Sequence, residues 1–188
     1  MSSNSGPEST PDPAGTAGTA GPAGPAGTAG AGNPAVAAVE DSGIAFRVVE
    51  HGPVRSLAEA AVARGVAVPD VVKTIVVRVG DGDYRFVLVP GDRVISWPKL
   101  RGLLGVNRLS MPDAATARDA TGYERGTITP FGSTTAWPVI ADERILGREI
   151  TLGGGRHGVA LAVDAAAAVG VLRATVADVS DAELPVSG

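Results

Sequence analysis

Cysteine is absent from this 188-residue chain, which excludes disulfides and thiolate metal sites. His51 and His157 are the only histidines, and no carboxylates stand near them at the spacing of a zinc site. We therefore predict no metal ion and no other cofactor. No run of about 18 apolar residues is present, so no transmembrane helix is expected. The N-terminus also lacks the order of a secretory signal, basic residues followed by apolar ones, so we expect a soluble cytoplasmic protein.

Positive charge is also scarce. The formal net charge is -4, and half of it lies in residues 1–35, which contain Glu8 and Asp12 but no Lys or Arg. A protein that holds nucleic acid along an extended face is normally basic. Any contact with nucleic acid should therefore be local, such as one chain end held in a pocket, or should be assisted by a partner.

Residues 1–35 consist almost entirely of Gly, Ala, Pro, Ser and Thr. Such a segment cannot bury enough apolar surface to offset the entropy lost on ordering, so we predict a disordered tail. The glycine spacing is not a strict triplet, which excludes a collagen helix. The folded domain is expected over residues 36–188.

Short helices and many strands are predicted after this tail. The clearest signal is Ser56 with Glu59, a capping-box pair that begins a helix ending at Gly65. Other helices are expected at residues 98–105, 113–120 and 164–170, and strands at residues 46–50, 71–79, 84–89, 107–110, 149–152, 159–163 and 174–179. This order predicts an α+β fold with a mixed, curved, barrel-like sheet surrounded by short helices.

Lys73 is the first candidate for function, because it lies in an otherwise apolar strand. Residues two apart share a face of a strand, so Lys73 shares its face with Ile75 and Val77. A lysine on an apolar face must reach water, form an ion pair or bind an anion. The pattern leaves open a strand-end lysine that reaches solvent and an anion site.

Two glycine-rich loops are the next candidates. Glycines bracket a proline in residues 126–132, which suits either a rigid loop that offers backbone N–H groups to an oxyanion or an ordinary turn. Consecutive glycines in residues 153–158 permit close approach of a ligand to backbone, yet they match neither the dinucleotide fingerprint nor the P-loop. A single histidine such as His157 is more often a structural or surface residue than a catalytic one. A nucleophilic Gly-x-Ser-x-Gly motif is absent.

Five motifs together resemble one known family. They are HGPVRSLAEAA (51–61), VKTIV (72–76), VLVPGD (87–92), TGYE with the following G…PFG (121–132), and GGGRHG (153–158). In this order and at these intervals they are similar to the YbaK/EbsC/ProX family, which includes the editing insertion of bacterial prolyl-tRNA synthetases. The resemblance covers residues 44–182.

The resemblance implies an enzyme that deacylates mischarged aminoacyl-tRNA in trans, with the substrate's own ribose hydroxyl assisting ester hydrolysis. It implies that Lys73 and Gly126 are the catalytic residues, with Lys73 holding the terminal nucleotide. The implied substrate-binding residues are Thr74, Thr129, Pro130, Phe131, Gly132, Gly154, Gly155, Arg156 and His157. Family members often carry Arg or Lys where His157 stands, which leaves its role open.

The partner implied by the resemblance is the 3′ end of a mischarged tRNA, and an aminoacyl-tRNA synthetase is a candidate second partner. The alternative is a non-catalytic module of the same fold that binds a nucleotide, a tRNA end or a protein. Such a module would usually have lost part of the site, whereas Lys73, Gly126 and Pro130 are all present. Their retention favours the enzyme.

Overall fold

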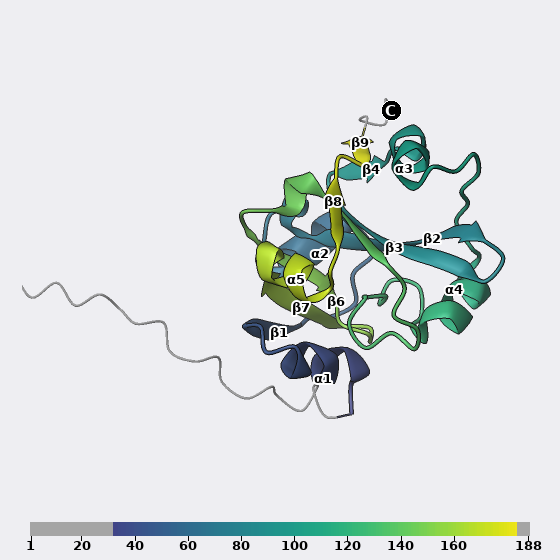
Figure 1. The fold of residues 1–188 in the computed structure, drawn as a ribbon. Helices are drawn as coiled ribbons and strands as arrows, with labels where there is room; N and C mark the ends of the chain where they lie inside the picture. Colours follow the sequence, from purple (N-terminus) through teal and green to yellow (C-terminus); the bar gives the residue numbers. More distant parts are fainter. Residues whose placement is uncertain (1–31, 184–188) are drawn as a thin grey trace, which may run out of the picture.

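The computed structural model describes residues 32–183 (Figure 1). It begins with α1 (Pro34–Asp41), which Asn33 caps by accepting a hydrogen bond from the Ala35 amide. Asn33 and Ala35 are buried, so the boundary predicted at residue 35 is wrong and belongs before Asn33. Composition misled the prediction because Pro and Ala also suit a first helical turn. The rest of the predicted tail, residues 1–31, lies outside the described residues.

The strands form three sheets within residues 32–183. The first is antiparallel, in the order β1 (Phe46–Glu50), β7 (Val159–Asp164) and β6 (Glu149–Gly153). The second has the order β2 (Val72–Gly80), β3 (Asp83–Pro90), β5 (Val139–Asp142) and β8 (Thr175–Ala177). The third pairs β4 (Arg93–Ile95) with β9 (Ser180–Ala182).

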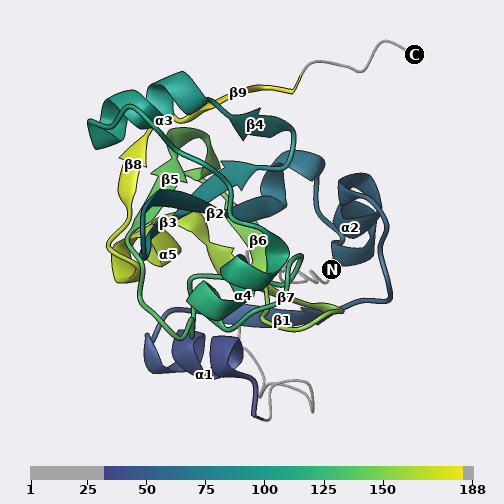
Figure 2. The ribbon, with the colours of Figure 1, turned by 90° about the vertical axis from the view of Figure 1, so that its right-hand side faces the viewer.

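The two larger sheets meet where β2 begins. Val71 forms a parallel bridge with Thr151 of β6, so the edge of the first sheet continues into the second. In the second sheet β2 and β3 are antiparallel, whereas β5 runs parallel to both β3 and β8. The result is a mixed, curved and open series of strands (Figure 2), which confirms the predicted α+β class.

Helices surround these strands. They are α2 (Leu57–Arg64), α3 (Trp97–Leu104), α4 (Ala114–Thr121) and α5 (Ala165–Val171), with 3-10 turns η2 (Val68–Asp70) and η3 (Glu143–Ile145). The predicted caps Ser56, Asp113 and Asp164 each accept a backbone hydrogen bond three residues on. No helix of residues 32–183 is long and apolar enough to cross a bilayer.

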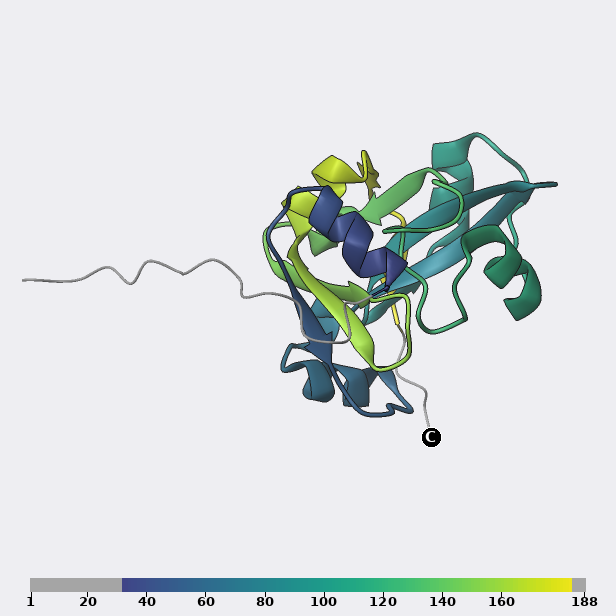
Figure 3. The same ribbon diagram turned by 90° about the horizontal axis from the view of Figure 1, so that it is seen from below.

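β3 carries buried side chains on both faces. Phe86 and Leu88 enter the main core with α1 and the first sheet, whereas Val87 and Val89 enter a second core beneath α3. A strand covered on both sides reads as a continuous apolar run, as this one does. α1 lies across the main core beside β1 (Figure 3).

Several short elements differ from prediction. Residues 107–110 form no strand but a single bridge between Ser110 and Arg78. The strand predicted at residues 174–179 stops at Ala177, and the following β9 pairs with β4. Neither β4 nor β9 was predicted, because three-residue strands carry too little alternation to be recognised. β5 and α1 were also missed.

Candidate functional site

A cleft with two adjoining lobes lies between α2, the start of β2 and the two glycine-rich loops. The first lobe, about 350 Å³, is lined by α2, residues 71–74, Gly126, Ile128 and Gly153. The second lobe, about 530 Å³, is lined by residues 51–54, Gly126 and residues 156–159. Both lobes share Val54, Arg64 and Gly126, so they form one continuous cleft.

Lys73 enters the first lobe from β2 and is half-buried. Its Nζ donates hydrogen bonds to the carbonyl oxygens of Gly91, at 3.1 Å, and Arg93. Burial lowers the pKa of Lys73, and the nearby carboxylates of Glu183 and Asp92 oppose that shift. Neutral carbonyls satisfy part of the ammonium's hydrogen bonding, and no carboxylate of residues 32–183 forms a direct ion pair with it, which suits an anion-binding role.

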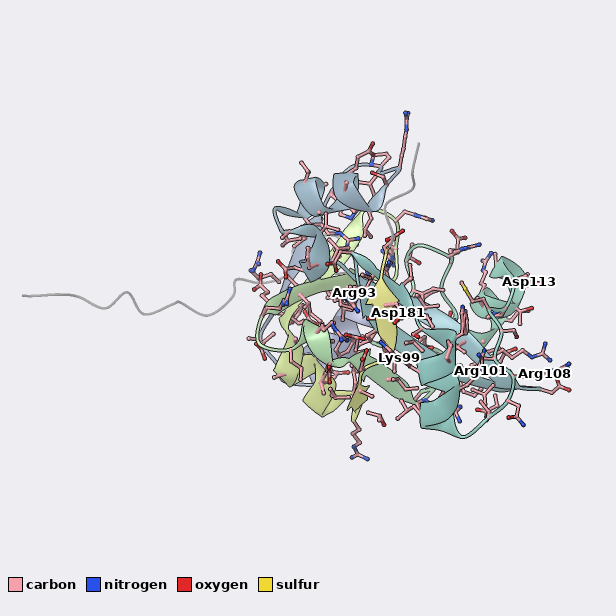
Figure 4. All side chains as sticks on the ribbon, turned by 90° about the horizontal axis from the view of Figure 1, so that it is seen from above. Arg93, Lys99, Arg101, Arg108, Asp113 and Asp181 are labelled. Carbon is pink, nitrogen blue, oxygen red and sulfur yellow. The ribbon has the colours of Figure 1, made fainter. Side chains whose placement is uncertain are left out.

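A buried network holds the Arg93 carbonyl in place. The Arg93 side chain donates from Nε to Ser180 Oγ at 2.7 Å, and the Ser180 hydroxyl donates to Asp142 at 2.7 Å. Burial by itself would raise the pKa of Asp142, but hydrogen bonds from Ser180 and from two backbone amides lower it. Figure 4 shows Arg93 close to Lys99 and Asp181, which form an ion pair at 2.9 Å. Strand β9 therefore fixes the backbone that Lys73 contacts.

Arg64 lies at the junction of the two lobes and was not predicted. Its Nη1 is 3.4 Å from Thr151 Oγ1, at the long limit of a hydrogen bond, and its Nε is buried without a partner in the described residues. Burial lowers the pKa of Arg64. The missed signal was helical spacing, because Leu57, Ala60 and Arg64 share the inward face of α2.

Gly126 lines both lobes and has a φ of +91°, a conformation that favours glycine. Its N–H donates no hydrogen bond within residues 32–183. The next residue, Thr127, accepts a hydrogen bond from the Gly155 amide at 2.9 Å. A Cβ on Gly153 would lie 2.7 Å from the Ile128 carbonyl oxygen, so glycine there lets the two loops cross.

The second half of the first loop turns away from the cleft. Thr129, Pro130 and Phe131 are buried, and the Phe131 carbonyl accepts a 2.7 Å hydrogen bond from the Tyr123 hydroxyl. Gly132 packs against α1, where an added Cβ would lie 2.2 Å from the Pro34 carbonyl oxygen. None of these four loop residues lines either lobe.

Gly154 and Gly155 also face protein rather than the cleft. The Gly154 carbonyl accepts a 2.8 Å hydrogen bond from the buried Asn33 side chain, and Gly155 packs against Tyr123 and Ala35. Asn33 and α1 therefore support both glycine-rich loops from behind. Sequence reasoning missed Asn33 because its partner is 121 positions away.

The remaining predicted residues do line the cleft. Thr74 lies in the first lobe, with a buried hydroxyl that lacks a partner in the described residues. Arg156 and His157 lie in the second lobe. Arg156 donates to the Gly32 carbonyl at 2.8 Å, and exposed His157 Nε2 is 3.2 Å from Glu124. The structure thus brings Lys73, Thr74, Gly126, Arg156 and His157 together.

The charge of this cleft is one-sided. Arg55, Arg64, Lys73 and Arg156 line it, and no Asp or Glu does. This contrasts with the net charge of -4 of the whole chain. Within residues 32–183 no group of three or more His, Asp or Glu side chains could hold a metal ion. The cleft therefore suits an anionic ligand.

Comparison with known proteins agrees with the motifs. A proline–tRNA ligase of Thermosipho melanesiensis is 33% identical over 100 residues, which cover 53% of this chain but 17% of the ligase. The hypothetical protein APE2540 has a similar solved structure (TM-score 0.71, 29% identity, 76% of this chain and 96% of that one). A proposed trans-editing enzyme for prolyl-tRNA synthetase also has a similar solved structure (TM-score 0.71, 30% identity, 77% of this chain and 93% of that one). The model of the aminoacyl-tRNA editing domain matches residues 51–169, and the chain belongs to that family.

Proposed function

We propose that this protein hydrolyses the ester bond of mischarged aminoacyl-tRNA. The observation that carries the proposal is the acid-free cleft, in which Lys73 and three arginines line a cavity large enough for a terminal nucleotide and its aminoacyl group. The family match to the aminoacyl-tRNA editing domain supports the same substrate class. Binding only the end of an RNA chain in a pocket also suits a protein whose overall charge is negative.

Lys73 and Gly126 have separate roles in this proposal. The Lys73 ammonium, now on two backbone carbonyls, binds a phosphate of the terminal nucleotide as a point charge. The N–H of Gly126, which donates to no acceptor in residues 32–183, stabilises the oxyanion that develops on the ester carbonyl. Thr74, Arg156 and His157 line the rest of the cleft and contact the substrate. The buried loop residues, Thr129–Gly132 with Gly154 and Gly155, shape the cleft from behind.

No His, Asp or Glu among the described residues lines the first lobe, and the proposal uses Lys73 as a phosphate contact rather than as a general base. We therefore assign activation of the attacking water to the substrate's own ribose hydroxyl, which orients it. The water oxygen attacks the ester carbon, the bond to the ribose oxygen breaks, and the released ribose oxygen takes up the proton that the water loses. The protein contributes mainly positioning and electrostatic stabilisation.

The proposed partners follow from the substrate. The 3′ end of a mischarged tRNA occupies the cleft, in the cytoplasm where tRNA is charged, and an aminoacyl-tRNA synthetase is a candidate partner. The similarity to part of a proline–tRNA ligase makes the prolyl system the first to test.

The absence of His, Asp and Glu from the described lining of the first lobe also fits a second function, a module that binds a tRNA end without hydrolysing it. One experiment separates the two. The full chain is incubated with tRNAs charged with Cys, Ala, Ser or Pro, and amino acid release is followed for wild type, Lys73→Ala and Arg108→Ala. Arg108 is exposed and lines neither lobe, so it is the control.

The enzyme proposal expects release from at least one tRNA, loss in Lys73→Ala and wild-type activity in Arg108→Ala. If wild type releases no amino acid from any of the four yet binds tRNA, the binding module is the correct function.

A further inference from the structure

Arg64 is the cleft residue whose environment is least explained by the fold itself. It ends the inward face of α2, after Leu57 and Ala60, where an apolar residue would continue the helix packing. Its guanidinium instead lies at the junction of the two lobes. A strongly charged group in that position needs partners, because desolvation of a charge is unfavourable.

The described residues supply few such partners. Arg64 forms no ion pair with a carboxylate in residues 32–183, and its single side-chain hydrogen bond is the 3.4 Å contact with Thr151. The Nε atom is buried and has no acceptor among the described residues. By contrast, the partly exposed Lys99 and Arg144 both form ion pairs with Asp178. The counter-charge for Arg64 is therefore expected from a ligand.

We propose that Arg64 binds a second backbone phosphate of the RNA strand whose terminal nucleotide Lys73 holds. This inference rests on the proposed function, because it places another phosphate of the same ligand in the same cleft. A guanidinium presents parallel N–H donors that match two phosphate oxygens, whereas an ammonium acts as a point charge. The two cations would thus fix the direction in which the strand crosses from one lobe to the other.

A structural role for Arg64 makes a different prediction. A cation in the last turn of a helix interacts favourably with the helix dipole, so its loss would lower stability. Such a role would leave the salt dependence of RNA binding unchanged. A phosphate contact contributes to that dependence, because each phosphate neutralised on a single strand changes the slope of log K against log salt by about 0.7.

The test measures binding of an uncharged, 5′-labelled single-stranded RNA ending in CCA by fluorescence anisotropy at several salt concentrations. The variants are Arg64→Gln, Arg64→Lys and the control Arg108→Gln, which makes the same charge change beside the β2–β3 turn (Figure 4). Thermal unfolding of each variant shows that it is folded.

We expect Arg64→Gln to weaken RNA binding about tenfold, the effect expected when one hydrogen bond to a charged group is lost. It should also reduce the slope of log K against log salt by about 0.7. Arg64→Lys should keep the slope and lose about threefold in affinity, because lysine keeps the positive charge but lacks the planar guanidinium. Arg108→Gln should change neither.

An unchanged slope in folded Arg64→Gln overturns the inference, as does an equal effect of Arg108→Gln or no binding of RNA by the wild type. Because the RNA carries no amino acid, this result is independent of hydrolysis. The inference can therefore fail while deacylation stands, and it can hold while deacylation fails.

Discussion

Arg64 and Lys73 reach the same lobe from α2 and β2, and neither forms an ion pair with a carboxylate within residues 32–183. Lys73 is held by two backbone carbonyls and Arg64 by one weak contact to Thr151. Partly buried cations that lack a direct ion pair oppose folding rather than favour it. An anionic ligand would supply that pairing, and the predictions below test the scaffold and the site separately.

The first prediction concerns Asn33. Asn33→Ala should lower the free energy of unfolding by about 1–3 kcal/mol, because it leaves the buried Gly154 carbonyl without its donor and removes the cap of α1. Urea unfolding measures the change. Asn107→Ala, at an exposed asparagine, is the control and should stay within about 0.5 kcal/mol of wild type. Equal effects of the two substitutions would mean that Asn33 does not hold the loop.

Gly132 provides a second prediction, with Gly147 as its matched control. Both have positive φ, at +66° and +77°, but only Gly132 has backbone where a Cβ would stand, 2.2 Å from the Pro34 carbonyl oxygen. Gly147→Ala should cost about 1–2 kcal/mol of stability from backbone strain alone. Gly132→Ala should cost about 1–3 kcal/mol more, from the clash with α1. Equal losses in chemical denaturation would show that α1 does not pack there.

Acid pH gives a third prediction. Hydrogen bonds from Arg144 and Lys99 lower the pKa of Asp178 to about 2, from an ordinary value near 3.8. A carboxyl with a depressed folded-state pKa stabilises the protein above its unfolded pKa, and this stabilisation is lost as pH falls through the folded value. Stability should therefore fall between about pH 4 and pH 2.

The check is the unfolding midpoint of wild type and Asp178→Asn across this pH range. The variant should be less stable than wild type at pH 6, and the gap should narrow towards pH 2. A gap that stays constant with pH would show that the Asp178 ion pairs contribute nothing to the acid response.

Local signals explain which parts of the fold were predicted correctly. Ser56, Asp113 and Asp164 each cap a helix through an amide three residues away, so a short stretch of sequence contains the whole interaction. Lys73 was also recognisable, since a lysine in an apolar strand is visible without knowledge of its neighbours. Gly126 was found through its place in the family motif, and the structure places it between both lobes.

The missed features depend on contacts between distant residues. The Asn33 side chain donates a hydrogen bond to Gly154, and Ser180 of β9 forms hydrogen bonds with Asp142 and Arg93. Nothing near these residues in the sequence marks them. Arg64 is different, because its position on the inward face of α2 follows from helical spacing, and that pattern could have revealed it.

Deacylation by wild type and Lys73→Met is the most direct test of the proposed function. Methionine keeps an unbranched side chain of similar length but removes the charge, so folding should be preserved while the phosphate contact is lost. The measurement is the rate of amino acid release from the tRNA that wild type hydrolyses fastest. We predict a fall of at least about 100-fold in folded Lys73→Met, the order expected for loss of one preorganised electrostatic contact. A folded Lys73→Met protein that releases amino acid at the wild-type rate would contradict the assignment of Lys73 and, with it, the site proposed here.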